Sequence, residues 1–450
     1  MTLATPTAAQ TLAEYAGALR YEDIPADVLD RARSCIIDTV AVATYGARFE
    51  WSAGIARYAE RYGTGGPCTL FGRPGVRLHA PFAALANGAF AHAFEQDSLR
   101  YPGAGVHPGA TLLPSALAIA QETGASGKDL LVAFVAGCET LFRIGAASRH
   151  SSEGLGFHAP GLTGPYGAAI AAGCLIRLDA ARLADALGIA GSLSSGLLAF
   201  TKATRGAQVK KLHLGRAAES GVLAARLAAE GVNGPETVLE GRSGFLEAYC
   251  REPDPGRLVA GLGTEWETLK ICLKPFPCHV MAHTPVRALR ALMTEHAFAP
   301  HEVEEIRVEG APKLLTHHGV VAPRDVMQAQ YSVPFCVALA LYRDPADPGS
   351  FDAAAIGDRD IRAACARVKL AALPADFKPR SSWHTRVQVL LRSGKRLLRD
   401  SPSFEGMPGE PMSPESLRAK FDLLTRDLGD CGSRSLFEKY ARLEETENLA

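Results

Sequence analysis

Apolar residues at helical spacing run through this 450-residue chain from Asp23 to about Gly261, with no strand-like alternation between them. The spacing predicts amphipathic or buried helices in DVLDRARSCIIDTVAVATYG, KDLLVAFVAGCETLFRIGAAS and RAAESGVLAARLAAEG. Alanine and glycine are abundant in these segments, so the helices can pack with their backbones close together. Because strands and helices do not alternate here, a doubly wound parallel sheet is excluded for this region.

The pattern changes near Glu265. ETLKICLKPF and EVEEIRVEG alternate apolar and polar residues, and TRVQVLLRSGKRLLRD predicts two strands joined at Ser393-Gly394. Helices are predicted in DRDIRAACARVKLAAL and in TPVRALRALMTEHA, where Thr284 would be the cap. This part of the chain is therefore predicted to be a small α+β domain.

Helical spacing returns after the proline-rich SPSFEGMPGEPMSPESL, in SLRAKFDLLTRDL and SRSLFEKYARLEE. A chain of this length exceeds one ordinary core. We therefore predict a mainly α protein with a large all-helical domain, residues 1–264 and 402–450, and a smaller inserted α+β lid domain, residues 265–401.

Composition limits the partners that we expect. Lys plus Arg equals Asp plus Glu at 48 each, which gives no overall charge to attract nucleic acid or an anionic membrane. The ten cysteines are scattered without a CxxC pair, a pattern typical of reduced thiols in a cytoplasmic protein. We expect no signal peptide, and the most apolar runs carry charges such as Glu139, Arg143 and Arg177 that argue against a membrane span.

Two segments share a form in which a histidine stands before a predicted helix start: HPGAT, from His107, and HAPGLT, from His158. The glycines and prolines are explained by one helix ending and the next beginning, but the imidazoles are not. A phosphate-binding loop does not fit, since GxGxxG is missing and no strand precedes. We predict that both histidines face one cavity.

The loop before His107 carries further ionisable residues, namely His92, Glu95, Asp97 and Arg100. An imidazole and a carboxylate this close in sequence could form an acid/base pair if the loop folds them together. For each residue alone, a solvated loop position is the alternative interpretation.

A basic segment, TKATRGAQVKKLHLGRAAE, has no acid before Glu219 and predicts a local anion site. A solvated basic face is the alternative, although interleaved leucines indicate partial burial. Its ionisable residues are Lys202, Arg205, Lys210, Lys211, His213 and Arg216.

A fourth segment, LKICLKPFPCHVMAH, places Lys274 between apolar residues and sets His279 and His283 four positions apart. That histidine spacing can bind zinc on a helix, but HExxH and a third ligand are missing. We therefore predict no metal site.

Taken in order, these segments resemble the MmgE/PrpD family, which includes 2-methylcitrate dehydratases, cis-aconitate decarboxylases and iminodisuccinate epimerases. The resemblance extends over nearly the whole chain. It rests on CIIDTVAVATYG, ANGAFAHAFEQD, HPGA, GFHAPGLTGPYGAA, VKKLHLGRAAESG, GPETVLEGRSGF and LKPFPCHVMAH.

The resemblance implies a helical domain with an α+β lid, a homodimer without cofactor, and a small di- or tricarboxylate substrate. It also implies that His107 and His158 are the active-site histidines and Lys210 and Lys274 the active-site lysines. Two departures stand out. The acidic pair that is usual in the family is only partly kept, in the Glu95–Ser98 segment, EQDS. Phe335 is found where the family's decarboxylases have a tyrosine, and Tyr331 lies one helical turn earlier.

We predict a cofactor-independent lyase or isomerase acting at the carbon next to a carboxylate, with lysines stabilising the developing charge and histidines moving the proton. Dehydration of a 2-methylcitrate-like hydroxy acid is the leading hypothesis, and epimerisation or decarboxylation of a related dicarboxylate or cis-aconitate is the alternative. A non-catalytic dimeric scaffold and a zinc enzyme are further hypotheses. The predicted catalytic residues are His107, His158, Lys210, Lys274 and Asp97, and the predicted substrate-binding residues are Glu95, Arg100, Lys211, His279 and Tyr331.

Overall fold

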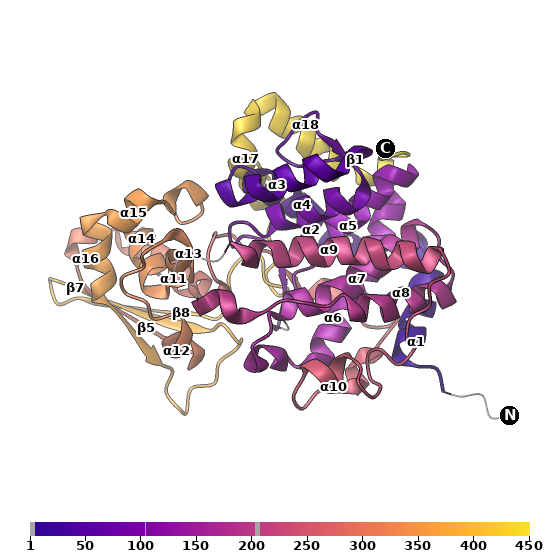
Figure 1. Cartoon of the computed structure of the whole chain (residues 1–450). Coiled ribbons are helices and arrows are strands. Elements are labelled where there is room, and N and C mark those ends of the chain that lie inside the picture. The colour runs from indigo at the N-terminus through magenta and orange to yellow at the C-terminus, as the bar shows by residue number, and fades with distance from the viewer. Residues whose placement is uncertain (1–4, 104, 203–207) are drawn as a thin grey trace. The chain divides into compact units, whose positions relative to one another are not determined.

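Helices make up most of the computed structural model, which describes residues 5–103, 105–202 and 208–450 (Figure 1). Backbone contacts divide the chain into two units. The first unit comprises residues 1–93, 97–272 and 415–450, and the second comprises residues 94–96 and 273–414. The predicted mainly α fold class is confirmed.

The first unit is built from helices, with two small antiparallel strand pairs, β1 (Thr64–Thr69) with β2 (Arg77–Leu78) and β3 (Leu99–Arg100) with β4 (Ile271–Cys272). The three long helical segments singled out in the sequence correspond to α2, α6 and α9. The helices are α1 (Ala8–Ala18), α2 (Ala26–Gly46), α3 (Glu50–Gly63), α4 (Ala80–Ala91), α5 (Pro108–Thr123), α6 (Gly127–Ser148), α7 (Ala159–Leu175), α8 (Ala180–Ser192), α9 (Val209–Ala229), α10 (Phe245–Tyr249), α17 (Pro414–Thr425) and α18 (Gly429–Ala441).

Glycines bring the central helices of this unit into close contact. A Cβ added at Gly88 of α4 would lie 2.8 Å from the Cα of Gly215 in α9, and one added at Gly215 would lie 2.1 Å from the carbonyl oxygen of Leu85. Farther along α9, a Cβ at Gly221 would lie 2.3 Å from the Cβ of Ala168 in α7. Side chains at these points would force the helices apart, so the predicted close backbone approach is confirmed.

Helix α6 is long enough to cross a membrane, and its most apolar window of 18 residues is apolar enough to do so. However, 89% of that window is buried inside the protein. The helix also carries the buried ion pair between Glu139 and Arg143. It has the character of a core helix.

The second unit contains a four-stranded sheet in the order β6-β5-β7-β8, in which β5 and β6 are parallel and the other neighbours antiparallel. The hairpin predicted at Ser393-Gly394 joins β7 to β8, and Gly394 has a φ of 84° that suits glycine. The strands are β5 (Val303–Gly310), β6 (Val368–Ala372), β7 (Thr385–Leu391) and β8 (Arg396–Ser401). The helices are α11 (His283–His296), α12 (Lys313–His317), α13 (Val326–Tyr331), α14 (Val333–Tyr342), α15 (Ala353–Gly357) and α16 (Arg359–Arg367).

Two local predictions in this unit were wrong. DRDIRAACARVKLAAL is half helix and half strand, because residues 368–372 leave α16 and pair in parallel with β5. Thr284 does not cap α11, which begins one residue earlier. Its hydroxyl instead donates to the carbonyl of Trp383 at 2.6 Å.

The units divide between Cys272 and Leu273, later than the predicted 264/265 boundary. Residues 265–272 stay with the first unit because β4 pairs with β3, and because the amide and hydroxyl of Thr268 donate to Glu139. Residues 402–414 belong to the second unit, where Leu273 donates its amide to the carbonyl of Gly406. The alternating pattern predicts strands, but it does not predict which strands pair with each other, and the pairing decides the boundary.

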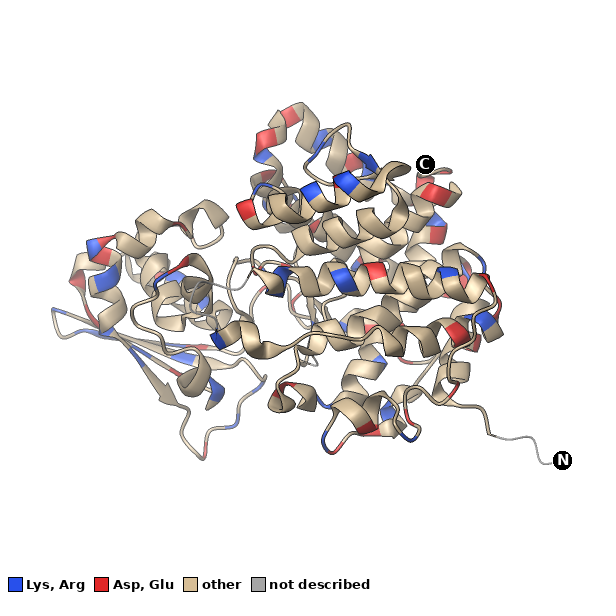
Figure 2. Cartoon of the chain, viewed as in Figure 1, with Lys and Arg blue, Asp and Glu red and all other residues tan. Residues whose placement is uncertain are grey.

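Charges of both signs are interspersed on the helices of the first unit, as Figure 2 shows. This distribution agrees with the equal numbers of basic and acidic residues in the chain.

All ten cysteines are unpaired, and eight of them are buried.

Replacing Gly215 by alanine is expected to destabilise the protein, although alanine is the better helix former by about 1 kcal/mol. The added Cβ would meet the Leu85 carbonyl in a packed core, a clash that costs about 1–3 kcal/mol or more. Calorimetry of the purified chain should therefore show a lowered Tm. Gly154→Ala is the control, because nothing lies within 4 Å of its added Cβ. An unchanged or raised Tm for Gly215→Ala would contradict the close α4–α9 contact.

Candidate functional site

The two predicted histidines both occupy N-cap positions, His107 before α5 and His158 before α7. Pro108 and Pro160 follow in the first turns, where a missing backbone N–H costs no helix hydrogen bond. Neither imidazole caps its own helix. The sequence form therefore fixes where each helix begins and leaves the rings for other contacts.

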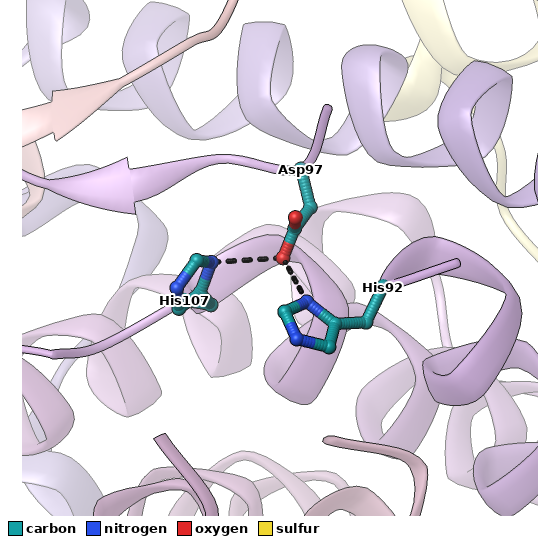
Figure 3. Close-up of side chains that lie close together, drawn as sticks. All are labelled: His92, Asp97 and His107. Carbon is teal, nitrogen blue, oxygen red and sulfur yellow. Dashed lines mark hydrogen bonds and ion pairs between the residues drawn. The ribbon is translucent and has the colours of Figure 1, made fainter. Parts of the chain in front are cut away.

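One carboxylate connects two of the histidines (Figure 3). Oδ2 of Asp97 lies 2.9 Å from Nδ1 of His92, which follows the C-terminus of α4, and 2.8 Å from Nδ1 of His107. A carboxylate oxygen only accepts, so contacts this short require a hydrogen on each Nδ1. In the neutral rings, Nε2 is then the basic atom. The prediction that Asp97 orients an imidazole agrees with this geometry.

Burial and pairing act in opposite directions on this group. Burial alone would raise the pKa of Asp97, but His92 and His107 outweigh it and hold the pKa well below its usual range. Burial lowers the pKa of His92 well below its ordinary value, despite the opposing effect of Asp97. The group is therefore an anionic carboxylate that accepts from a neutral, buried imidazole and from a more accessible one.

His158 lies in the same cluster. Its ring centroid is 6.0 Å from that of His92, and its Nδ1 is 3.0 Å from Nδ1 of His213 in α9. Burial, followed by His213 and His107, lowers the pKa of His158 to about 3. The first unit thus brings together the two histidines predicted to face one cavity, along with two others.

Lys210 contributes the cation of this cluster. It is the second residue of α9, and its side chain is buried. Its charge lowers the pKa of both His92 and His213, which places the ammonium within electrostatic reach of both rings. A buried cation among neutral imidazoles suits an anionic ligand.

The other members of the basic segment have different environments. Lys211 is buried, whereas Lys202 is exposed and Arg216 pairs with Glu219 near the surface. Arg205 lies outside the described residues. The predicted anion site is therefore concentrated on Lys210 and Lys211, and its ligand stays a prediction.

Two predicted residues of the second unit contact each other. Nζ of Lys274 donates to the Glu95 carbonyl at 3.1 Å and lies 3.8 Å from its carboxylate, and both side chains are buried. Gln330 holds the preceding residue, donating to the carbonyl of Phe94 at 2.9 Å. Lys274 and Gln330 thus fix the short segment 94–96 to this unit.

His279 and Tyr331, both predicted to bind substrate, are also neighbours within the second unit. Their rings lie 5.1 Å apart, and His279 stacks on His318 at 4.1 Å. Phe335, which departs from the family pattern, is buried against Phe351. The tyrosine ring is therefore beside a histidine pair, and His318 is a member that the sequence motifs did not indicate.

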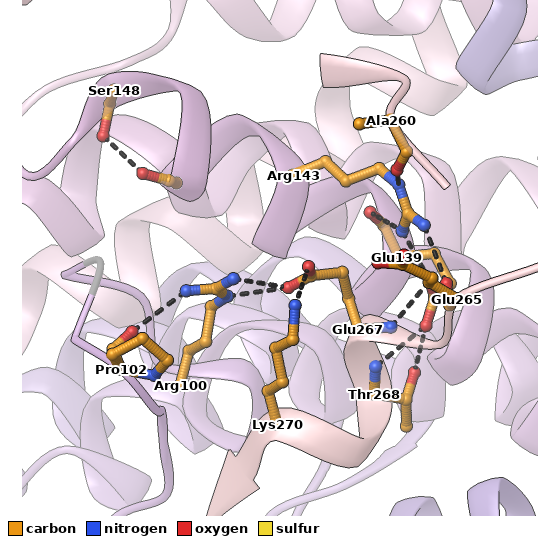
Figure 4. A network of polar contacts seen from close by, with 11 residues as sticks. Arg100, Pro102, Glu139, Arg143, Ser148, Ala260, Glu265, Glu267, Thr268 and Lys270 are labelled. Atoms are coloured by element: carbon orange, nitrogen blue, oxygen red, sulfur yellow. Dashed lines mark hydrogen bonds and ion pairs between the residues drawn. The ribbon is translucent and has the colours of Figure 1, made fainter. Parts of the chain in front are cut away.

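Arg100 is already paired within a buried network (Figure 4). Its guanidinium donates to Glu267 at 2.8 Å and to the Pro102 carbonyl at 2.9 Å, and Lys270 pairs with the same carboxylate. Nearby, Glu139 accepts from Thr268 and pairs with an arginine of α6. These contacts favour a structural role for Arg100 over the predicted substrate binding.

The zinc hypothesis on His279 and His283 gains no support from the described residues. His283 is fully buried between aromatic rings and contacts the Cys278 thiol, whereas His279 stacks on a different histidine. Among the described residues, the group close enough to hold a metal ion is His92, Asp97 and His107, within 4.8 Å of one another. The short contacts to Asp97 account for the same geometry by hydrogen bonding.

Residues 10–258 match the MmgE/PrpD N-terminal domain, and residues 276–442 match the MmgE/PrpD C-terminal domain. A cis-aconitate decarboxylase of Aspergillus terreus is 34% identical over 299 residues, which cover 63% of this chain and 60% of the fungal protein. A cis-aconitate decarboxylase of Mus musculus is 27% identical over 449 residues, 96% of this chain and 90% of that protein. A cis-aconitate decarboxylase-like protein, oryM, of Aspergillus oryzae is 32% identical over 67% of this chain and 66% of its own length. These matches confirm the resemblance drawn from the motifs.

The neutral state of His158 predicts a pH dependence of stability. Its pKa is about 3 in the folded protein and about 6.5 when unfolded, so between these values the unfolded chain binds a proton that the folded chain does not. The free energy of unfolding should therefore fall as the pH falls from about 6.5 toward 3. His158→Gln should reduce this slope, as measured by urea unfolding at a series of pH values.

The slope should not vanish in His158→Gln, because burial also lowers the pKa of His318 to about 4. His79→Gln replaces an exposed histidine of the first unit and serves as the control, with the parental slope expected. If His158→Gln also keeps the parental slope, His158 does not stay neutral in the folded protein.

Proposed function

This chain belongs to the MmgE/PrpD family, and on that basis we propose that it is a decarboxylase of a small unsaturated tricarboxylate of the cis-aconitate type. The cluster of Lys210, the Asp97 carboxylate and neutral histidines is the observation that carries the proposal. The names of the fungal and mouse relatives favour decarboxylation over the dehydration that led the sequence-based hypotheses.

Lys210 is proposed to bind a substrate carboxylate. Decarboxylation breaks the bond between a carbon and its carboxylate, and the electron pair stays on the carbon as carbon dioxide leaves. A second carboxylate in conjugation shares that negative charge. A buried ammonium nearby stabilises the charge more strongly than water would, because the surroundings are poorly polarisable.

The histidines are proposed to manage the proton. The carbon that keeps the electron pair must accept a proton, which a positioned imidazole can deliver. The contact with Asp97 fixes Nδ1–H on His107 and leaves Nε2 as its acid/base atom. His158 is the second candidate, since its Nε2 makes no hydrogen bond with any described residue.

Dehydration of a hydroxy acid is the second candidate function, because the same groups can serve it. A histidine would remove the proton next to a carboxylate, and another would protonate the leaving hydroxide. The two reactions differ in one respect that can be measured. Dehydration needs no net proton, whereas decarboxylation takes up one proton for each carbon dioxide released.

Several sequence-based expectations stay proposals. Lys274 stays a proposed catalytic residue, and Lys211, His279 and Tyr331 stay proposed substrate-binding residues. A homodimer that needs no cofactor is likewise proposed from the resemblance to the family, and a cytoplasmic location is proposed from the scattered cysteines.

The proposed reaction can be tested by incubating the chain with cis-aconitate and, separately, with citrate and 2-methylcitrate. Proton NMR should show a product one carboxylate smaller from cis-aconitate, and none from the hydroxy acids. Activity should persist in EDTA after dialysis, because the proposed roles use side chains alone. Dehydration of a hydroxy acid without carbon dioxide release would overturn the proposal, and activity that returns only with added metal would overturn the cofactor-independent part.

Asp97→Asn is expected to lower kcat by about 10²–10⁴-fold with the fold intact. The amide can turn its NH₂ toward either ring, so the two Nδ1–H atoms are no longer specified. Asp430→Asn, at an exposed position on α18, is the matched control and should keep the parental rate. Circular dichroism checks folding, and a parental kcat for Asp97→Asn would remove the carboxylate from the mechanism.

A further inference from the structure

His213 is a member of the histidine cluster to which the proposed mechanism gives no role. It lies three positions after Lys210 on α9, so both side chains are on one face of the helix. Its ring is half-buried, whereas His158 is 6% exposed. The pair thus connects a buried ring to one that reaches solvent.

The contact between the two rings has a definite chemical meaning. Nδ1 of His158 and Nδ1 of His213 are 3.0 Å apart, and two facing lone pairs would repel at that distance. One Nδ1 therefore carries a hydrogen and the other accepts it. When His213 donates, the hydrogen of neutral His158 is on Nε2, at the opposite end of the buried ring.

We propose that His213 is a positioning and proton-relay residue that supplies solvent protons to His158 for the proposed decarboxylation. The inference rests on that proposed function, because only a reaction that consumes a proton needs such a supply.

Each bond to hydrogen that breaks in the relay is matched by one that forms. The C–C bond to the carboxylate breaks and carbon dioxide leaves. The carbon to which the electron pair moves through the conjugated system takes the proton from Nε2 of His158 and forms a C–H bond. Nδ1 of His158 takes the proton from Nδ1 of His213, whose Nε2 takes one from water. Both rings stay neutral overall and exchange tautomers. After the product leaves, Nε2 of His158 takes a proton from water in the open site, Nδ1 of His158 returns its proton to Nδ1 of His213, and Nε2 of His213 releases one to water, which restores the starting tautomers.

The surroundings of His213 favour passing a proton on to His158 over holding it on the His213 ring. Burial and the neighbouring Lys210 lower the pKa of His213, so a proton that it receives is readily passed on. Phe200 packs against both rings, at 5.4 Å from His158 and 5.9 Å from His213, and limits their positions. The other charged or titratable groups that act on His158 are Asp97, His107 and Glu153.

The test uses the full chain with cis-aconitate as substrate. His213→Gln keeps a hydrogen-bond donor for His158 but cannot relay a proton, so kcat should fall about 10²-fold while KM changes little. His213→Ala leaves space for an added imidazole, which should restore much of the rate. His79→Gln, an exposed histidine of the same unit, is the control and should keep parental kinetics.

Solvent deuterium separates a relay from a structural role. In D₂O the product of the parent chain should carry one deuterium, at the carbon that is protonated after carbon dioxide leaves. The solvent isotope effect on kcat should be larger in His213→Gln than in the parent, because proton supply has become slow, and imidazole should reduce the effect in His213→Ala.

The outcomes distinguish the two proposals. If the parent chain releases no carbon dioxide from cis-aconitate, the proposed function fails, and the relay fails with it. If the parent is active and His213→Gln keeps the parental kcat, the relay alone is overturned. A slow His213→Ala that imidazole does not rescue, with the parental isotope effect, would assign His213 a purely structural role and also overturn the relay.

Discussion

The close packing of small-residue helices sets the positions of the chemical groups in the first unit. His92 follows the last turn of α4, His107 and His158 precede the first turns of α5 and α7, and Lys210 lies in the first turn of α9. Each group is therefore at an end of one of these helices. Because α4 and α9 touch through glycine, their separation is fixed by backbone contact. The distances between the rings depend on that separation, so the packing of the core also determines the geometry of the histidine cluster.

Buried charges in the first unit are stabilised in two ways. Away from the cluster, three described pairs match ions of opposite sign, which offsets part of the cost of removing them from water. These pairs are Arg143 with Glu139, Arg100 with Glu267 and Lys420 with Asp38. The Asp97 carboxylate is instead stabilised by the N–H groups of two imidazoles, one of them buried and neutral. Such rings keep a basic nitrogen for chemistry, which an ion pair with a guanidinium would not provide.

The sequence predicts local features of this arrangement well, because they depend on neighbouring residues. Histidine followed by proline and small residues is typical of a helix start, and both predicted starts are where the structure has them. The sequence predicts poorly those contacts that join residues far apart in the chain. Nothing local indicates that VKLAA leaves a helix to pair with β5, or that His213 meets His158 across 55 residues. Nor does anything local indicate that Arg100 pairs with Glu267, which is 167 residues away.

The same limit applies to the chemistry that the cluster can perform. Motifs name the histidines, but only the contacts state which nitrogen holds a hydrogen and which ring stays neutral. Neutral imidazoles with lowered pKa values do not store protons, so a reaction that consumes one must draw it from water in every turnover. A reaction that only moves a proton between substrate atoms has no such need. The proposed route from solvent to the buried His158 is therefore the structural feature by which the proposed decarboxylation would differ from dehydration, since both reactions are proposed to use the same lysine and the same histidines.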